Sequence, residues 1–482
     1  MLLCSPPLSF CRRQSPVEDS LPDSSLLSAV EFDRSGEFLA TGDRGGRVVV
    51  LRCDDNKAAG KLHYKFHCEF QSHEAEFDYV KSVAIEEKIN KIKWLPTTNG
   101  HQFMLTTNDR AVKLWKLAEK EVKFATGFNL TNDKGQKAGK KIKTLRLPKL
   151  EMVEALVTAT PKRVFSGDIH KFNIHSLCPS SDGETFLSAD NLCINQWSLH
   201  RTDISYNIVN IKPADIQTLT EVITSADLDA SNHNMFMYAT NRGVVRLGDL
   251  REKALNDVPS RLFSDPALEA LDKKGPASST PAANRPFLND MLRSISDVKF
   301  SQGGRFIVAR DYMNIKVWDV AMEKRPLDII PVHDYLQPKL WDLYENESIF
   351  DCFDVAVSAQ GEVLTGSYGN FFHVYDLNAK SDTMVEASKP PVTVPITHAQ
   401  GGAAGGRDSQ RKDTKKKRLS RPGIVSLLGG GRKKKTSETK GGPVEVDPQT
   451  LSYDKRIMQL AFHPDCNAVA VAGENNLFIY AR

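Results

Sequence analysis

A unit of three short strands recurs along this chain, and the repetition constrains the fold more than any other feature. Each copy reads as an apolar strand, a turn that often carries Gly or Asn, a second apolar strand, a polar turn and a third strand. The copies span residues 29–51, 89–117, 175–199, 223–250, 295–320, 353–377 and 457–481. Such units cannot bury their faces alone, but in a radial arrangement each sheet packs on the next. The sequence therefore predicts an all-β fold, a seven-bladed β-propeller.

Two sets of residues recur at fixed places in the repeat, and we interpret both as structural. Polar residues precede the third strand, where a carboxylate or amide can accept hydrogen bonds from turn N–H groups; they are Asp43, Asp109, Asp190, Asn241 and Asp311. Tryptophans stand near strand ends, where core packing is the expected role; they are Trp115, Trp197 and Trp318.

The excess length of the chain lies in its connections, where a rigid scaffold usually carries function. We predict a disordered tail over residues 1–24, a propeller over 25–482 and a largely disordered basic insert at 380–450. Only three strands are visible in each repeat. We expect some fourth strands to come from the connections, and the closing blade to borrow a strand from before residue 29.

The charge of the chain is divided unevenly. Residues 407–440 hold 13 Lys or Arg and 3 Asp or Glu, whereas the remainder holds 51 basic and 57 acidic residues. The propeller is thus acidic and should attract basic partners, while nucleic acid would be attracted only to the insert, so it is not an expected partner.

Several function classes lack support in this sequence. It contains no phosphate-binding loop, nucleophile elbow, zinc-protease motif or kinase signature, so nothing predicts an enzyme, a catalytic residue or a cofactor. The nearest metal constellation, His63, His67, Cys68 and His73, lacks a second Cys/His pair at a finger-like distance, and no metal is expected. No run reaches the roughly 18–20 apolar residues of a membrane span. The eight scattered cysteines fit a reducing compartment, which favours the cytoplasm, with the nucleus as a second location.

One stretch resembles a known family. FQSHEAEFDYVKSVAIEEKINKIKWL (70–95) closely resembles the 55-kilodalton B-type regulatory subunits of protein phosphatase 2A, a WD-repeat family. The resemblance continues through EFDRSGEFLATGDRGGRVVV, SYNIVNIKPAD, LTEVIT, RSISDVKF, RDYMNIKVWD, LYENESIFDCF and TGSYGNFFHVYD. It covers nearly the whole chain from about residue 25, and it agrees with the repeat count.

The resemblance implies a regulatory role in a heterotrimer. The chain would join a helical-repeat scaffold (A) subunit and a catalytic (C) subunit, and would select phosphoserine and phosphothreonine substrates with basic flanks. The alternative is a WD-repeat adaptor or scaffold protein without a phosphatase partner.

In that family an acidic groove on the top face receives substrates. The matching positions here are Glu86, Glu87, Asp190, Leu192, Leu219, Val222, Tyr344, Glu345 and Phe350. Carboxylates would steer Lys or Arg, and the apolar side chains would bury one side of a short helix or strand. The chain departs from the family pattern at Asn191 and Gln217, where acidic residues are usual. Each missing rim charge is expected to weaken binding of basic partners by about 1 kcal/mol.

The resemblance also implies a scaffold-docking hairpin arm at residues 127–150. Its apolar anchors would be Phe128, Leu130, Leu145 and Leu147. The middle of the arm, GQKAGKK, is more basic than the family pattern.

Overall fold

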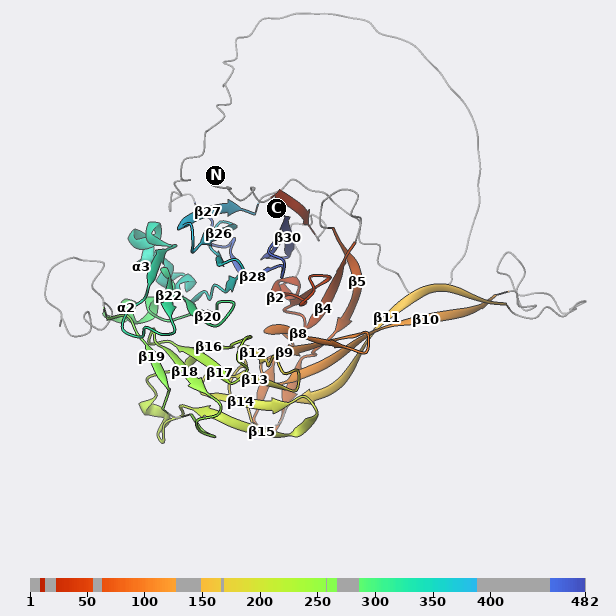
Figure 1. Ribbon diagram of the computed structural model, residues 1–482, viewed down its shortest axis with the longest axis horizontal. Helices are drawn as coiled ribbons and strands as arrows, with labels where there is room; N and C mark the ends of the chain where they lie inside the picture. Colours follow the sequence, from red (N-terminus) through yellow and green to blue (C-terminus); the bar gives the residue numbers. More distant parts are fainter. Residues whose placement is uncertain are drawn as a thin grey trace, which may run out of the picture. The chain divides into compact units, whose positions relative to one another are not determined.

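The computed structural model describes residues 9–13, 23–54, 63–126, 149–165, 169–256, 258–266, 286–387 and 451–481. These residues belong to one compact unit, which comprises 1–394 and 447–482. Seven four-stranded antiparallel sheets stand around a common centre (Figure 1). The inner strand of each sheet contacts the inner strand of the next, and the last contacts the first. The predicted seven-bladed β-propeller is confirmed.

The first four blades follow one another along the chain, each written here from its inner to its outer strand. Blade 1 comprises β2 (Leu27–Phe32), β3 (Phe38–Asp43), β4 (Arg47–Cys53) and β5 (Tyr64–Gln71). Blade 2 comprises β8 (Lys91–Thr98), β9 (His101–Thr107), β10 (Val112–Thr126) and β11 (Lys149–Phe165). Blade 3 comprises β12 (Ser176–Pro179), β13 (Thr185–Ala189), β14 (Cys193–Ser198) and β15 (Arg201–Asn210). Blade 4 comprises β16 (Ile223–Leu228), β17 (Met235–Thr240), β18 (Val245–Asp249) and β19 (Arg261–Phe263).

The last three blades complete the ring. Blade 5 comprises β20 (Asp297–Phe300), β21 (Phe306–Arg310), β22 (Asn314–Asp319) and β23 (Asp328–Pro331). Blade 6 comprises β24 (Val355–Val357), β25 (Glu362–Gly366), β26 (Phe371–Asp376) and β27 (Ser381–Glu386). Blade 7 comprises β28 (Ile457–Phe462), β29 (Ala468–Gly473), β30 (Asn476–Ala481) and β1 (Ser9–Arg13).

Short elements decorate the connections between blades. A hairpin of β6 (Glu76–Asp78) and β7 (Val83–Ile85) lies between blades 1 and 2. The helical elements are η1 (Asp23–Ser25), η3 (Ile216–Thr218), α2 (Pro286–Leu292), η4 (Asp334–Lys339), α3 (Leu340–Glu345) and η5 (Ser348–Phe350). In the part of the chain that the structure describes, none of the helices has the length and apolar character to cross a bilayer.

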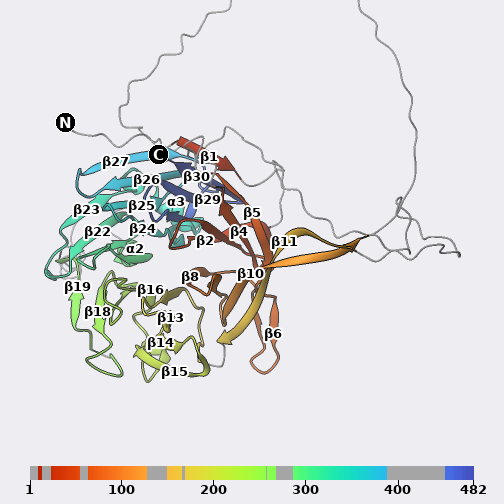
Figure 2. The same cartoon turned by 45° about the vertical axis from the view of Figure 1, so that its right-hand side comes forward.

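Strand β1 closes the ring. It pairs antiparallel with β30, with Ser9 opposite Ala481 and Arg13 opposite Phe478, and Figure 2 shows the two strands side by side. This is the strand that the closing blade was expected to borrow from before residue 29. It lies inside residues 1–24, so the predicted disordered tail does not hold for these five residues. Similarly, β27 occupies the start of the insert predicted at 380–450, and residues 388–450 lie outside the described ranges.

The core consists of apolar layers between neighbouring blades. Every residue of β3, β25 and β29 is buried, because the middle strands of a blade face a neighbouring sheet on both sides. Clusters of buried apolar side chains lie at each of the seven interfaces between consecutive blades. Trp115, Trp197 and Trp318 are buried in these layers, which confirms their predicted role.

Hydrogen bonds also join the inner strands of consecutive blades. Serines in or next to the inner strands donate hydrogen bonds to the next blade. The donor and acceptor atoms are Ser28 Oγ and Ile89 O at 2.6 Å, Ser225 Oγ and Asp297 Oδ1 at 2.7 Å, and Ser296 Oγ and Phe353 O at 2.8 Å. Between blades 3 and 4, the N–H of Ala226 donates to Ser176 Oγ at 3.0 Å. The inner end of each of these blades is therefore held by polar contacts as well as by apolar packing.

The polar turn residues follow the sequence prediction in part. The Oδ1 atoms of Asp190 and Asp311 each accept a hydrogen bond from the backbone N–H two residues further on, at 2.8 and 2.9 Å. In blade 2 this role falls to Asn108, whereas Asp109 accepts from the Asn90 amide at 2.8 Å.

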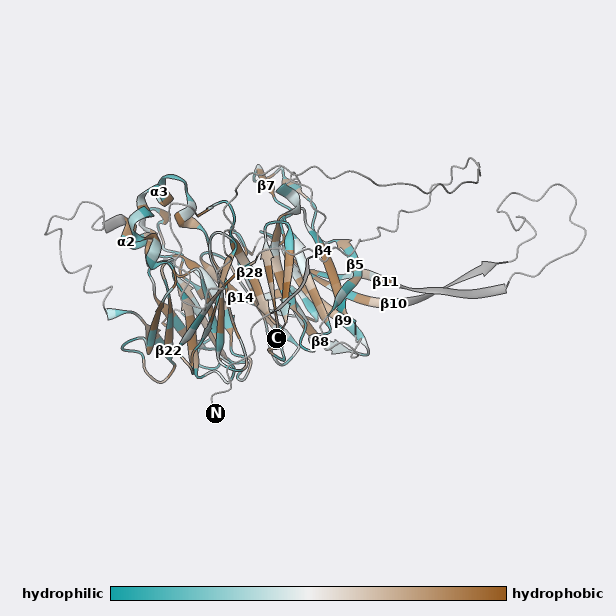
Figure 3. Ribbon diagram, turned by 90° about the horizontal axis from the view of Figure 1, so that it is seen from above, coloured by the Kyte–Doolittle hydropathy of each residue, from teal (hydrophilic) through white to brown (hydrophobic). Residues whose placement is uncertain are grey.

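The strand order defines an upper face of the propeller. Because the strands within a blade alternate in direction, the turns between second and third strands lie at the same end as the connections between blades. We call this end the upper face. Figure 3 shows β7, α2 and α3 projecting on the same side of the ring.

Deleting residues 1–13 should destabilise the propeller, since it removes β1 and exposes the edge of β30. Four residue pairs join these strands, and with a net contribution of about 0.5–1.5 kcal/mol from one hydrogen bond in each pair we expect a loss of about 2–6 kcal/mol. Chemical denaturation would measure it. Deletion of residues 1–8 alone, which retains β1, is the control; equal stability of the two truncations would contradict the closing role of β1.

Candidate docking face

The upper face carries all the predicted groove residues that the structure describes. Glu86 and Glu87 lie in the connection between blades 1 and 2, and Asp190 and Leu192 in the β13–β14 turn. Leu219 and Val222 lie in the connection between blades 3 and 4. Tyr344 and Glu345 belong to α3, and Phe350 to η5, between blades 5 and 6. Residues from four distant parts of the chain thus share one face.

The acidic pair follows an exposed hairpin. At the tip of β6–β7, Asp78 Oδ1 accepts hydrogen bonds from the N–H groups of Val80 and Lys81, which fixes the turn. The tip presents Tyr79 at 86% exposure and Val80 at 94%. Beyond β7, Glu86 is exposed and Glu87 half-buried. The Asn108 amide holds this segment by donating to Glu86 O at 3.1 Å.

Asp190 and Leu192 are buried, in contrast to the other predicted groove residues. Asp190 is 1% exposed and Leu192 is 2% exposed. His170 Nδ1 lies 2.9 Å from Asp190 Oδ2, His170 Nε2 lies 2.6 Å from Ser188 Oγ, and Trp197 Nε1 donates to the same hydroxyl at 2.8 Å. This chain of contacts crosses blade 3 from its upper turn to its core. Both side chains therefore serve the fold rather than an open binding surface.

The ionisation of Asp190 reflects this network. Burial raises the pKa of its carboxyl, but hydrogen bonds from the His170 side chain and from backbone N–H groups outweigh burial, and the net pKa lies below the ordinary value. The charged carboxylate is therefore the form that the fold stabilises.

Leu219 and Val222 stand beside the turn of blade 4. Both are half-buried. Val222 N–H donates to Asn241 Oδ1 at 3.0 Å, and Asn241 N–H donates to Val222 O at 3.1 Å. Just before them, η3 is capped by Asp215 and exposes Gln217. Two apolar side chains thus lie at the surface in a loop that is fixed at both ends.

Tyr344, Glu345 and Phe350 form an aromatic and acidic cluster together with Trp341. The ring centroids of Trp341 and Tyr344 are 5.4 Å apart, and those of Tyr344 and Phe350 are 6.3 Å apart. Trp341 Nε1 donates to Glu345 Oε1 at 2.6 Å. Phe350 is 55% exposed. This cluster offers apolar area and a carboxylate within one short stretch of chain.

A buried polar network supports the cluster from below. The hydroxyl of Tyr368, a residue with no exposed surface, donates to Ser348 O at 2.7 Å and lies 3.0 Å from the hydroxyl of Tyr312. Asp351 pairs with Arg456 and also lies 3.0 Å from the Tyr368 hydroxyl. These contacts hold the backbone of η5, which carries Phe350.

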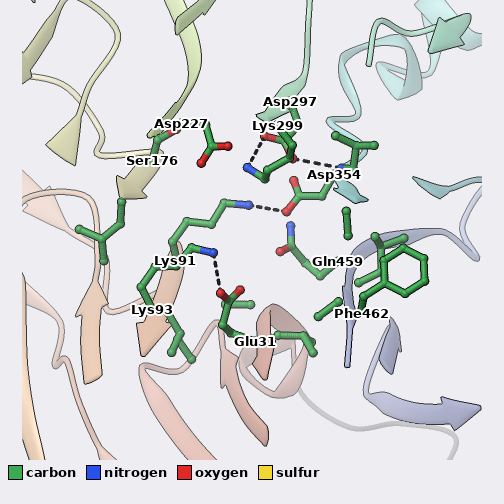
Figure 4. Close-up of a pocket in the computed structure, with 18 of the residues that line it drawn as sticks. Glu31, Lys91, Lys93, Ser176, Asp227, Asp297, Lys299, Asp354, Gln459 and Phe462 are labelled. Carbon is green, nitrogen blue, oxygen red and sulfur yellow. Dashed lines mark hydrogen bonds and ion pairs between the residues drawn. The ribbon is translucent and has the colours of Figure 1, made fainter. Parts of the chain in front are cut away.

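The inner strands surround a cavity of about 230 Å³ whose lining is highly charged (Figure 4). Three lysines and four acids line it: Lys91, Lys93, Lys299, Glu31, Asp227, Asp297 and Asp354. Lys91 Nζ pairs with Asp354 Oδ2, Lys93 Nζ lies 2.6 Å from Glu31 Oε1, and Lys299 Nζ lies 3.1 Å from Asp297 Oδ1. We call this set the channel network.

Burial and charge act in opposite directions on the channel network. Burial raises the pKa of Asp227 and of Asp354 above the ordinary value. For Asp297 burial also favours the neutral form, but Lys299 and Lys91 outweigh it and the pKa lies below the ordinary value. Within the described ranges, no group of three or more His, Cys, Asp or Glu side chains is arranged to hold a metal ion.

The predicted scaffold anchors lie outside the described residues. Phe128, Leu130, Leu145 and Leu147 fall within 127–148. The flanking strands are described: β10 and β11 pair from Val112 opposite Phe165 to Thr126 opposite Lys149, and they extend away from the ring (Figure 1). A long hairpin therefore leads up to the residues predicted to form the arm.

Sequence reasoning missed several residues of this face and of the channel. Trp341 lies three residues before Tyr344, and this helical spacing could have suggested it. Lys91 and Lys93 alternate with apolar residues in the inner strand β8, and Lys299 lies between Val298 and Phe300 in β20, which is an unusual place for charge. His170 had no local signal, because its partners come from other parts of blade 3.

Comparisons with known proteins add little to this description. No family model matches the chain. Among solved structures, it is similar to Raptor from Chaetomium thermophilum, with 12% identity and a TM-score of 0.49 over 95% of this chain and 28% of that one. The chain thus spans less than a third of that neighbour. The class of the protein, a seven-bladed β-propeller, follows from its own sheet topology.

Replacing Asp190 with Asn should cost about 2–4 kcal/mol, because it breaks a buried, charge-assisted hydrogen bond to His170. The pKa of Asp190 is lower in the folded protein than in the unfolded chain. Its contribution to the free energy of unfolding is therefore complete above the pKa of the unfolded chain, and it is lost as the pH falls through the pKa of the folded protein. Denaturant titration at several pH values should therefore show a difference in the free energy of unfolding between wild type and Asp190→Asn, and this difference should decrease at acidic pH.

The matched control is Asp182→Asn. Asp182 Oδ1 likewise accepts backbone hydrogen bonds in a turn of blade 3, at 2.7 and 3.1 Å, but it is exposed. We expect it to cost less than about 1 kcal/mol. Equal losses for the two variants would contradict the role assigned to the buried network.

Proposed function

We propose that this chain is a regulatory subunit of a protein phosphatase 2A-type heterotrimer. It binds a helical-repeat scaffold subunit and a catalytic subunit, and it recruits phosphoserine and phosphothreonine proteins with basic flanks. The observation that carries the proposal is the placement of Glu86, Glu87, Tyr344, Glu345 and Phe350 on one face, although they lie far apart in sequence. The family resemblance of the same segments supports it.

The chemistry of the upper face suits a basic partner. Glu86 and Glu345 are exposed carboxylates that can attract Lys or Arg, and Phe350 offers apolar area beside them. An aromatic side chain held by a fixed backbone loses little entropy on binding, so it is a suitable anchor. Leu219 and Val222 add half-buried apolar surface on the same face.

In this proposal the hydrolysis occurs in another chain. The propeller raises the rate for chosen substrates by holding the phosphorylated residue near the active site of the catalytic subunit, an effect of local concentration and orientation. The purified chain alone is inactive towards phosphopeptides. Its place of action is the cytoplasm and also the nucleus.

The second candidate is a propeller adaptor without a phosphatase partner. Asn191 and Gln217 favour it, since each replaces a usual acidic residue of the family's groove with an uncharged one. The two candidates differ in their partners, and partner capture separates them.

Affinity capture of the tagged full-length chain from cell extract should retain a helical-repeat scaffold and a phosphatase catalytic chain, identified by mass spectrometry. Deleting residues 127–148 should abolish capture of the scaffold, because the arm between β10 and β11 is lost. Deletion of 267–285, another connection, is the control. Equal scaffold recovery in all three samples would reject the arm, and absence of scaffold from the intact chain would favour the adaptor.

Replacing Phe350 with Ala should weaken binding of a basic phosphopeptide by about tenfold or more, the usual effect of removing an aromatic anchor. Fluorescence anisotropy with a labelled phosphothreonine peptide flanked by arginines would measure the affinity. Phe66→Ala is the matched control, since Phe66 is 46% exposed on the outer strand β5. Similar affinities for the two variants would contradict the role of Phe350.

A further inference from the structure

The ion pair between Lys91 and Asp354 joins two blades that are not neighbours. Lys91 begins the inner strand of blade 2, and Asp354 directly precedes the inner strand of blade 6. The two residues are 263 positions apart in sequence, and their side chains are 24% and 17% exposed. Figure 4 shows the pair crossing the cavity between the inner strands. The pair therefore spans the mouth of the ring.

The other two pairs of the channel network are local. Lys93, two residues after Lys91 on the same strand, binds Glu31 in the adjacent blade 1. Lys299 binds Asp297 within its own strand. Of the three lysine pairs that line the cavity, the Lys91 pair is thus the one that connects opposite sides of the ring.

Each end of this pair is a few residues from the proposed docking face. Glu87 lies four residues before Lys91, and Phe350 lies four residues before Asp354. The intervening chain is anchored on both sides: Ile89 and Phe353 are almost fully buried. Each end of the pair is therefore linked to the docking face by a short segment that contains a buried side chain.

We propose that the Lys91–Asp354 pair sets the separation between the acidic half of the docking face, at Glu86 and Glu87, and its aromatic half, at Phe350. Both are positioning residues and neither touches the partner. The partner is a basic segment that contacts both halves at once, so its affinity depends on their spacing. This inference rests on the proposed function of the upper face.

When their spacing is fixed, the two halves of the docking face contribute cooperatively to the binding free energy. A partner that has bound one half then reaches the other without any further loss of conformational entropy in the protein. Loss of the pair loosens the two segments relative to each other. Binding of the partner must then order the two segments, which weakens the affinity. The contributions of the two halves to the binding free energy become independent of each other.

The test compares three variants of the full chain. Lys91→Met removes the cross-channel pair, Lys91→Arg retains it, and Lys93→Met removes a lysine of the same strand that pairs only with the adjacent blade. With the arginine-flanked phosphothreonine peptide, we expect about tenfold weaker binding for Lys91→Met, within the range of measured couplings between neighbouring residues. Lys91→Arg and Lys93→Met should bind within about twofold of wild type. In the Lys91→Met background, the effects of Glu87→Gln and Phe350→Ala should become additive.

Hydrogen exchange without peptide provides a readout that does not require the proposed function. Amides of residues 85–91 and 347–354 should exchange faster together in Lys91→Met, but not in Lys93→Met. If Lys91→Met does not fold, Asp354→Asn takes its place.

Each outcome decides the inference or the function. Unchanged exchange in both segments overturns the inference, as does faster exchange with undiminished affinity, since the pair would then stabilise only the ring. If wild type binds no basic phosphopeptide, the proposed function fails, while coupled exchange would still support the positioning role of the pair.

Discussion

The closed circle of inner strands is the constraint on which the rest of the molecule depends. A blade buries both faces of its middle strands only if a neighbour stands on each side, so every interface needs the ring to be complete. The inner strands β28 and β2 close this circle, and β1, a strand from the opposite end of the chain, completes blade 7 as its outer strand. Serine hydrogen bonds between inner strands and the Lys91–Asp354 pair add polar contacts at the centre.

The sequence was most informative where side chains are buried. The first three strands of each repeat carry the apolar pattern, since they pack between sheets. The number of repeats then predicted a propeller with seven blades. The outer strands were harder to find because their burial is slight: β27 has no buried residue and β15 has two. Strand β1 was anticipated only from the need to close the ring, and its residues could not be identified from a pattern.

The groove residues show a different limit of sequence reasoning. Motif matching placed all of them on one face, but it could not separate side chains that project from those that support. Leu192 follows a polar turn and was expected to contact a partner, yet it directly precedes β14 and its side chain is buried. The carboxylate of Asp190 contacts His170 and accepts a hydrogen bond from a backbone N–H of the turn, so its charge is already compensated. The contacts that decide such cases come from residues distant in sequence.

The charged centre supports the proposal that partners bind at the upper face. A partner entering the channel would have to displace lysines and carboxylates that already satisfy one another, and each charge left unpaired in a buried place would oppose binding. The face above carries no such penalty, because Glu86 and Glu345 remain in water and Phe350 is already exposed. A basic segment can therefore gain contacts there without breaking any that the fold requires. In the proposed arrangement, the channel network supports the face and does not compete for its ligand.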